Sequence, residues 1–207
     1  LVGIVTLWIG GFDLIYALPG ETEAGWTATL SRAVSLGTSH MSLYQLTIEP
    51  GTRFATLVRE GRFTPLDDDA AADLFEVTRA MTEGAGLPAD EVSNHARPGE
   101  ESRHNLTYWR YQDYCGIGPG AHGRRGGMAT VRHKKPENWL AAVADRGSGL
   151  SEERTLSASE QACEALLMGL RLREGIDLAA LEQRFGMAGT AALIDADKAA
   201  FYTRQGL

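Results

Sequence analysis

The chain alternates between short apolar runs and longer segments in which apolar residues recur every three or four positions. Phe12–Leu18 is an apolar run typical of a buried strand, and His40–Ile48 is a second one. Between them, Trp26 and Leu30 stand at helical spacing after Thr22, a candidate N-cap. A strand, a helix and a strand within about 37 residues predict a βαβ unit whose two strands are parallel neighbours.

The same alternation continues toward residue 93. A short helix is expected near Phe54–Glu60 and a longer one over Asp67–Glu83. The apolar stripe predicted for the longer helix consists of Ala70, Leu74, Val77 and Met81. Glu91–Ser93 is a candidate third strand. The pattern is typical of an α/β protein with helices outside a parallel sheet.

Residues 94–135 show little periodicity and hold four of the five histidines. A loop-rich stretch of this length is more often functional than idle. Pro136–Arg146 is expected to be helical, and 147–149 resemble a linker. After it, three helices are expected, beginning near Ser157 or Ser159, at Asp177 and near Thr190, with Cys163 on the core-facing stripe of the first.

Composition narrows the possible functions. Lys+Arg 20 against Asp+Glu 27 gives a net charge of −7, and no basic stretch favours nucleic acid or a membrane surface. The apolar start, Leu1–Phe12, ends well short of the roughly 18 residues that a membrane span needs, so no transmembrane segment is expected. Two cysteines, Cys115 and Cys163, fit a reducing cytosol and exclude a three-cysteine iron–sulfur site within this chain.

Three features are candidates for chemistry. Asp13, at the start of an apolar strand, is either a solvent-facing edge residue or an acceptor for ribose hydroxyls or an amine. The glycine-dense stretch 116–123 is better explained as a tight turn than as a phosphate loop, because Pro119 removes a donor. The histidines and Cys115 match no compact zinc-ligand spacing.

A further candidate is the stretch His104–Trp109, which places an imidazole beside two large aromatic residues. It is a plausible surface for a flat iron-containing ring with His104 as axial ligand. The alternative is a histidine packed among aromatic side chains, and chemistry alone favours that alternative.

Five segments in order resemble the HemW branch of the radical S-adenosylmethionine proteins, relatives of oxygen-independent coproporphyrinogen III oxidase. They are DLIYALPGET at 13–22, SLYQLTIEPGT at 42–52, EVSNHARPG at 91–99, RHNLTYWRYQDYCGIGPGAHG at 103–123 and HKKPENWL at 133–140. The resemblance implies a partial radical-SAM (β/α) barrel over 12–146, after an atypical segment 1–11. It also implies a truncated helical, winged-helix-like domain over 151–207.

The resemblance also implies site residues and partners. It assigns Asp13 to S-adenosylmethionine and His104, Asn105 and Tyr108 to haem, with His104 as the ligand of the haem iron. Such proteins are viewed as cytoplasmic haem chaperones that hand haem to respiratory proteins, and the full-length family carries a 4Fe-4S cluster.

The departures from the family pattern set the expectation for this chain. The CxxxCxxC cluster motif is absent. Asp90 stands where Tyr is usual in the family, and Ser102 stands where Cys is frequent. We therefore expect an incomplete, haem-binding copy without the cluster. A coproporphyrinogen oxidase-like enzyme in a full-length form and a remnant without ligand function are the alternatives.

Overall fold

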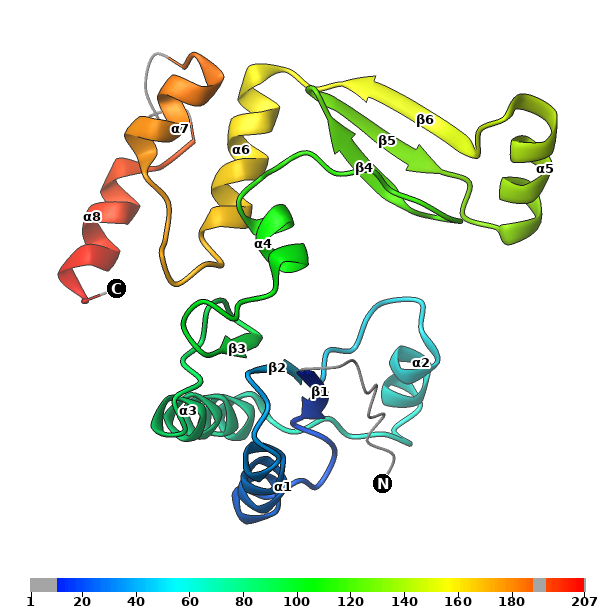
Figure 1. Cartoon of the computed structure of the whole chain (residues 1–207). Helices are drawn as coiled ribbons and strands as arrows, with labels where there is room; N and C mark the ends of the chain where they lie inside the picture. The colour runs from blue at the N-terminus through cyan, green and yellow to red at the C-terminus, as the bar shows by residue number, and fades with distance from the viewer. Residues whose placement is uncertain (1–10, 188–192, 207) are drawn as a thin grey trace. The chain divides into compact units, whose positions relative to one another are not determined.

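The computed structural model describes residues 11–187 and 193–206. These residues form two compact units, the first ending at Ser102 and the second beginning at Arg103, and each is described by itself (Figure 1). The segment 1–11, apart from Gly11, lies outside the described residues, as does the predicted helix start near Thr190. The domain limits at 146 and 151 that the composition suggests stay predictions.

The first unit carries the predicted βαβ arrangement. Its elements are β1 (Gly11–Tyr16), α1 (Glu23–Ser35), β2 (His40–Gln45), α2 (Arg53–Arg59), α3 (Asp68–Gly84) and β3 (Asn94–Ala96). β1 and β2 pair in parallel, and the strand order is β1-β2-β3 (Figure 1). Thr22 accepts a hydrogen bond from the backbone N–H of Gly25, which confirms it as the N-cap of α1.

The third strand corrects the expectation of a purely parallel sheet. β3 runs antiparallel to β2 and covers Asn94–Ala96 rather than Glu91–Ser93. The backbone reverses between Ala89 and His95, which form an antiparallel bridge, so β3 is the returning arm of a tight hairpin. The sequence pattern indicated an extended segment here, but it carried no signal for this reversal.

The buried face of α3 differs from the predicted apolar stripe. Its buried residues are Ala71, Leu74, Thr78 and Thr82. The threonines are satisfied inside the core: the indole N–H of Trp26 donates to Thr78 Oγ1 at 2.8 Å, and Thr82 Oγ1 lies 2.8 Å from Nδ1 of His95. Buried polar groups with partners are tolerated, and these two bonds lock α1 and β3 onto α3.

The second unit combines a sheet with a group of helices. Its elements are α4 (Arg103–Trp109), β4 (His122–Arg125), β5 (Met128–Arg132), α5 (Pro136–Arg146), β6 (Leu150–Thr155), α6 (Ala158–Gly169), α7 (Leu178–Phe185) and α8 (Ala196–Arg204). The three strands pair antiparallel in the order β4-β5-β6. The stretch 94–135, expected to be loop-rich, therefore contains three strands and a helix.

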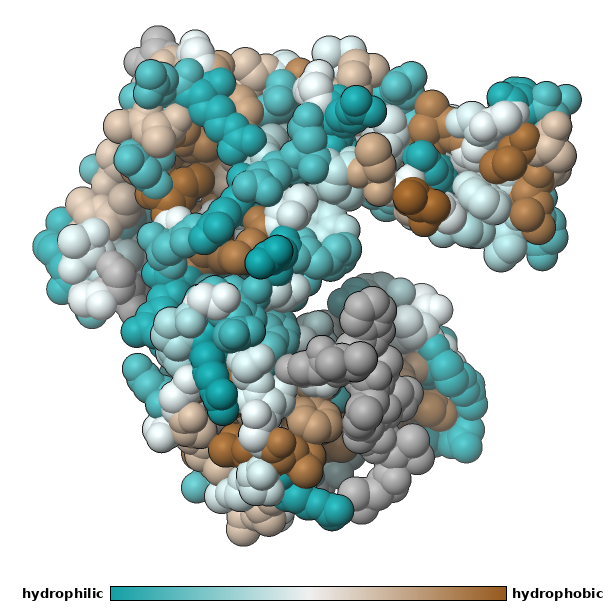
Figure 2. Space-filling model, in the orientation of Figure 1, coloured by the Kyte–Doolittle hydropathy of each residue, from teal (hydrophilic) through white to brown (hydrophobic). Residues whose placement is uncertain are grey.

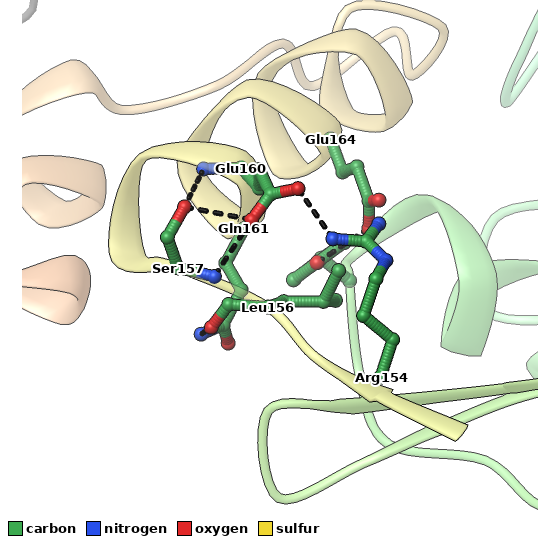
Figure 3. Close-up of polar contacts among 7 residues, drawn as sticks. Arg154, Leu156, Ser157, Glu160, Gln161 and Glu164 are labelled. Carbon is green, nitrogen blue, oxygen red and sulfur yellow. Dashed lines mark hydrogen bonds and ion pairs between the residues drawn. The ribbon is translucent and has the colours of Figure 1, made fainter.

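A capping box connects β6 to α6. Ser157 Oγ accepts from the backbone N–H of Glu160, whose carboxylate accepts from the backbone N–H of Ser157 (Figure 3). Arg154, at the end of β6, also donates to this carboxylate. The bonds from Ser157 and then from Arg154 lower the pKa of Glu160 to about 2. The helix therefore begins at a position set by the strand before it.

The buried face of α6 corrects the prediction for Cys163. The helix buries Ala162, Ala165, Leu166 and Gly169, whereas Cys163 is exposed together with Leu167 and Leu170. A Cβ at Gly169 would lie 2.9 Å from Cδ1 of Ile176. Because the packing is this close, the face of α6 that is buried is the one with small residues. In Figure 2, apolar side chains on the visible face lie in separate small areas rather than one patch.

Within the described ranges, no helix is long and apolar enough to cross a bilayer. Segments 1–10 and 188–192 lie outside this finding.

The buried His95 predicts a pH-dependent stability of the first unit. Burial first of all lowers the pKa of His95 from 6.5 to about 4, with Glu91 opposing the shift and Arg79 and His40 adding to it. The unfolded chain therefore takes up a proton that the folded chain excludes, so stability is lost as pH falls from 6.5 toward 4. We expect the difference in unfolding free energy between wild type and His95→Asn to narrow by about 1 kcal/mol for each pH unit as the pH falls from 6.5 to 4.

Urea unfolding at a series of pH values measures this gap. His122→Asn is the control, because the His122 side chain is exposed. A gap for His95→Asn that stays constant between pH 6.5 and 4 would contradict the prediction.

Candidate functional site

Asp13 lies on the face of the first sheet that points away from the hydrophobic core. In the strand register Asp13 stands opposite Ser42, and Ser42 stands opposite Asn94, so the three residues form one row across the sheet. Met41 and Leu43, on the other face, belong to the core with α1 and α3. The alternation of side chains along a strand thus presents Asp13 on a polar face.

A buried hydrogen-bond network supports this row from one side. Ser42 Oγ donates to Asn94 Oδ1 at 2.9 Å, and the Asn94 side-chain amide donates to Glu91 Oε1. Glu91 also accepts from the backbone N–H of Ser93 at 2.9 Å. Ser42, Glu91 and Asn94 are all buried. Sequence reasoning did not single out these residues, although the SLYQL and EVSN segments contain them.

His40 lies one row from Asp13 on the same face of the sheet. Its register partner on β1 is Gly11, two residues before Asp13. The Nε2 atom of His40 is buried and has no hydrogen-bond partner among the described residues. Burial lowers the pKa of His40, and the charges of Asp13 and Glu91 partly offset this shift. An exposed carboxylate beside an unpartnered imidazole nitrogen is suited to hold a polar ligand by hydrogen bonds.

Asp90, one of the departures from the family pattern, carries a desolvated carboxyl group. Both of its carboxyl oxygens are buried without a hydrogen-bond partner among the described residues. Burial is the main cause that raises the pKa of Asp90 from 3.8 to about 6, and the charges of Glu91 and Glu101 add to it. The ionised form is therefore disfavoured in the folded state.

Replacing Asp90 by asparagine is expected to stabilise the first unit. Because the folded-state pKa is raised, the ionised carboxyl costs stability above pH 6, and the cost disappears as pH falls through the range from 6 to 3.8. For this half-buried group we expect Asp90→Asn to raise the unfolding free energy by about 1 kcal/mol at pH 8, and by nothing near pH 3.5. Chemical denaturation at the two pH values measures both quantities.

Asp73→Asn, an exposed position on α3, is the matched control. An equal gain for both variants, or a gain for Asp90→Asn that persists at low pH, would count against the prediction.

The haem-motif residues lie on the short helix α4 in the second unit. The imidazole of His104 meets the ring of Tyr108 edge-on, with 4.8 Å between centroids. Tyr108 in turn meets the ring of Tyr114 at 4.6 Å. His104 is exposed and Tyr108 is half-buried. The structure therefore brings His104 and Tyr108 together, as the spacing of four residues on a helix requires.

Asn105 does not share this face. It follows His104 by one position on α4, which turns its side chain by about 100° around the helix axis. Asn105 is half-buried and makes contacts of its own. Of the three predicted haem residues, the structure thus brings together two, His104 and Tyr108.

Tyr111 connects the end of α4 to the rest of its unit. Tyr111 follows the helix in the left-handed conformation, with φ of 53°, a position that glycine usually occupies. The N–H of Tyr111 donates to the carbonyl of Tyr108, and the N–H of Gln112 donates to that of Thr107, which makes a Schellman motif. A buried aromatic residue here implies that its contacts outweigh the strain of about 1–2 kcal/mol.

Those contacts come from three sides. The guanidinium of Arg124 lies 3.4 Å from the centroid of the Tyr111 ring, and the Tyr111 hydroxyl donates to Glu164 on α6 at 2.6 Å. Arg184 on α7 donates to the backbone carbonyl oxygens of Arg110 and Tyr111. Burial and the bond to Glu164 raise the pKa of the Tyr111 hydroxyl, so it stays protonated as the donor.

The glycine stretch 116–123 forms the tight turn expected from its sequence. A Cβ at Gly116 would collide with the carbonyl oxygen of His122, and a Cβ at Gly123 would lie 2.7 Å from Thr130 Oγ1. Only glycine permits this close approach of the two arms. No group of three or more potential metal ligands occurs among the described side chains.

The chain is similar in sequence to proteins of known name. Residues 156–207 match the family model described as HemN C-terminal domain. The chain is 33% identical to Heme chaperone HemW of Bacillus subtilis, covering 84% of this chain and 46% of that protein. It is 38% identical to Heme chaperone HemW of Mycobacterium tuberculosis (strain H37Rv), covering 82% of this chain and 43% of that protein.

Two further matches are a vertebrate protein and a solved structure. A zebrafish (Danio rerio) protein named Radical S-adenosyl methionine domain-containing protein 1, mitochondrial, is 37% identical, covering 79% of this chain and 39% of that protein. The solved structure is the coproporphyrinogen III oxidase HemN of Escherichia coli, with a TM-score of 0.70 at 18% identity, covering 88% of this chain and 44% of that one.

The fold is thus that of a mixed α/β protein similar to HemN. The chain is similar to the HemW proteins over most of its own length, and its residues 156–207 match the HemN C-terminal domain. It spans about half the length of the curated relatives it matches.

Proposed function

We propose that this chain binds haem in the manner of a HemW-type chaperone, through His104 on α4. The observation that carries the proposal is the exposed imidazole of His104, which stands against the ring of Tyr108, with Tyr114 on Tyr108 in turn. Among the described residues His104 has no hydrogen-bond partner, so a ring nitrogen is available to iron. Its HemW relatives carry haem in their names, which supports the proposal.

The surroundings of His104 fit a haem ligand better than a structural histidine. A structural histidine in a core is normally buried and hydrogen-bonded, as His95 is in the first unit. His104 has neither property, and the adjacent tyrosine rings offer flat surfaces on which a porphyrin packs. When bound, the haem would be held through its iron by a nitrogen of His104, and Tyr108 would border the ring. Asn105, whose side chain leaves α4 about 100° away from that of His104, stays a prediction from the family resemblance.

S-adenosylmethionine is the second ligand that we propose, at Asp13. Asp13, with the unpartnered Nε2 of His40 in the next row, supplies an acceptor and a polar neighbour for ribose hydroxyls or an amine. The β1-α1-β2 unit and its fold similarity to HemN support a partial radical-SAM barrel over 12–146. The match over 156–207 supports a HemN-type helical domain, for which we propose a winged-helix-like arrangement.

A 4Fe-4S cluster does not fit the residues of this chain. Such a cluster needs at least three thiolates, and the two cysteines lie at positions 115 and 163. We therefore propose an incomplete copy with respect to cluster chemistry and derive no reaction step through that group. A cytoplasmic location and haem-accepting respiratory proteins as partners remain predictions from the family resemblance.

Haem titration tests the His104 assignment. We expect ferric haem added to the purified chain to give a shifted Soret band, and His104→Ala to weaken binding about tenfold or more because the iron loses its axial nitrogen. His133→Ala, which removes a histidine elsewhere in the same unit, is the control and should bind like wild type.

Identical spectra for wild type and His104→Ala would remove the haem role. Absence of any haem binding together with poor solubility would favour a remnant without ligand function instead.

A separate measurement addresses the enzymatic alternative, a coproporphyrinogen III oxidase-like activity. Because the chain lacks three cysteine ligands, we expect no methionine or 5′-deoxyadenosine after anaerobic reduction with S-adenosylmethionine. Release of either product by the purified chain, but not by a blank without protein, would refute this expectation.

A further inference from the structure

One face of the sheet β4-β5-β6 bears a hollow that the haem and S-adenosylmethionine assignments do not use. Its volume is about 290 Å³, enough for a small organic molecule. The lining includes Cys115, Arg125, Thr130, Arg132 and Glu153. All of these residues belong to the second unit.

Strand register explains why these side chains converge. Met128 and Thr130 alternate along β5 and therefore point to one face of the sheet. Arg132 follows a register irregularity at Val131/Arg132 and lines the same hollow. Arg125 on β4 pairs with Met128, and Glu153 on β6 pairs with Thr130, so both share that face.

The edge of the same sheet adds Cys115. Tyr114 forms an antiparallel bridge with Arg124, which sets the next residue, Cys115, beside Gly123. Gly123 pairs with Thr130 and has no side chain to fill the space above the sheet. The exposed thiol of Cys115 therefore borders the hollow.

The two arginines of the hollow differ from their neighbours in having no partner. Arg110 pairs with Glu174, Arg124 with Glu164 and Arg154 with Glu160. Arg125 and Arg132 make no ion pair or side-chain hydrogen bond with any described residue. The carboxylate of Asp113 accepts from the backbone N–H of Gly126, the residue after Arg125.

The placement of the two charges specifies the ligand. From Met128, the register partner of Arg125, to Arg132 the strand advances four residues, or about 13 Å. Two guanidinium groups on long side chains thus flank the hydroxyl of Thr130 from opposite ends. Each can hold a carboxylate or phosphate by two parallel hydrogen bonds. In a chain of net charge −7, this is a local site for anions.

We propose that this hollow, here named the Arg125–Arg132 hollow, binds a small oxyanion with negative groups at both ends. Arg125 and Arg132 bind the two ends, and Thr130 donates a hydrogen bond to the middle. Glu153 repels the ligand and sets the affinity below what the arginines alone would give.

The exposed thiol of Cys115 serves as a reporter, and the exposed thiol of Cys163 on α6 is an internal reference. Iodoacetamide labelling of both cysteines is followed by peptide mass spectrometry, with citrate or pyrophosphate added at constant ionic strength. At an anion concentration twice its dissociation constant, the labelling rate of Cys115 should fall about threefold. The rate at Cys163 should not change.

Variants separate a built site from general charge effects. Arg125→Gln combined with Arg132→Gln should abolish the protection of Cys115, whereas Arg173→Gln, an exposed arginine of the same unit, should retain it. Glu153→Gln should strengthen protection several-fold at the same anion concentration. Circular dichroism confirms that each variant is folded.

The two anions distinguish the ligand chemistry. Protection by citrate alone indicates a carboxylate ligand, protection by pyrophosphate alone indicates a phosphate ligand, and either result supports the proposal. No protection by either anion, or equal protection in the double variant, overturns it. Because haem binding through His104 is measured separately, its failure would leave this result unaffected.

Discussion

The contact between Arg124 and Tyr111 is the interaction on which the second unit depends. The guanidinium carbon of Arg124 lies 3.4 Å from the centroid of the Tyr111 ring, and the same group faces Glu164, the acceptor of the Tyr111 hydroxyl. A buried cation, a buried ring and a partly exposed carboxylate thereby join β4, the end of α4 and α6. Because desolvated cation–π and charge-assisted contacts are strong, this cluster tolerates a tyrosine at a left-handed position. The cluster anchors the end of the seven-residue helix that carries His104, beside the contacts of Trp109 with Arg171 and of Arg110 with Glu174.

The first unit uses polar groups in two different ways. On the core side, Thr78 and Thr82 are fully paired with Trp26 and His95, which makes the packing of α3 specific. On the opposite face, Ser42 is held by Asn94, but the Nε2 of His40 is left without a partner. Paired buried groups contribute to the fold, whereas the unpaired Nε2 of His40 beside Asp13 supports the ligand that we propose there.

Parts of both candidate sites followed from local patterns. The i, i+4 spacing of His104 and Tyr108 predicts their ring contact on any helix, and the apolar run around Asp13 predicts its strand. The network behind Asp13 did not follow, because Ser42, Glu91 and Asn94 come from segments separated by about 50 residues. Likewise, Arg125 and Arg132 carry no motif, and only the register of two strands places them on one hollow.

The amino-acid sequence by itself determined the helix starts at Thr22, Asp67 and Asp177, and the parallel pairing of the first two strands. It narrowed the start of α6 to Ser157 or Ser159, of which the structure shows Ser157. These features depend on interactions within a few residues or on a short crossover connection, so local chemistry decides them. The tertiary structure alone decided that β3 runs antiparallel, that α6 exposes Cys163 and buries its small residues, and that α3 buries threonines. Each of those outcomes depends on a partner distant in the chain, whose position a periodic pattern does not contain.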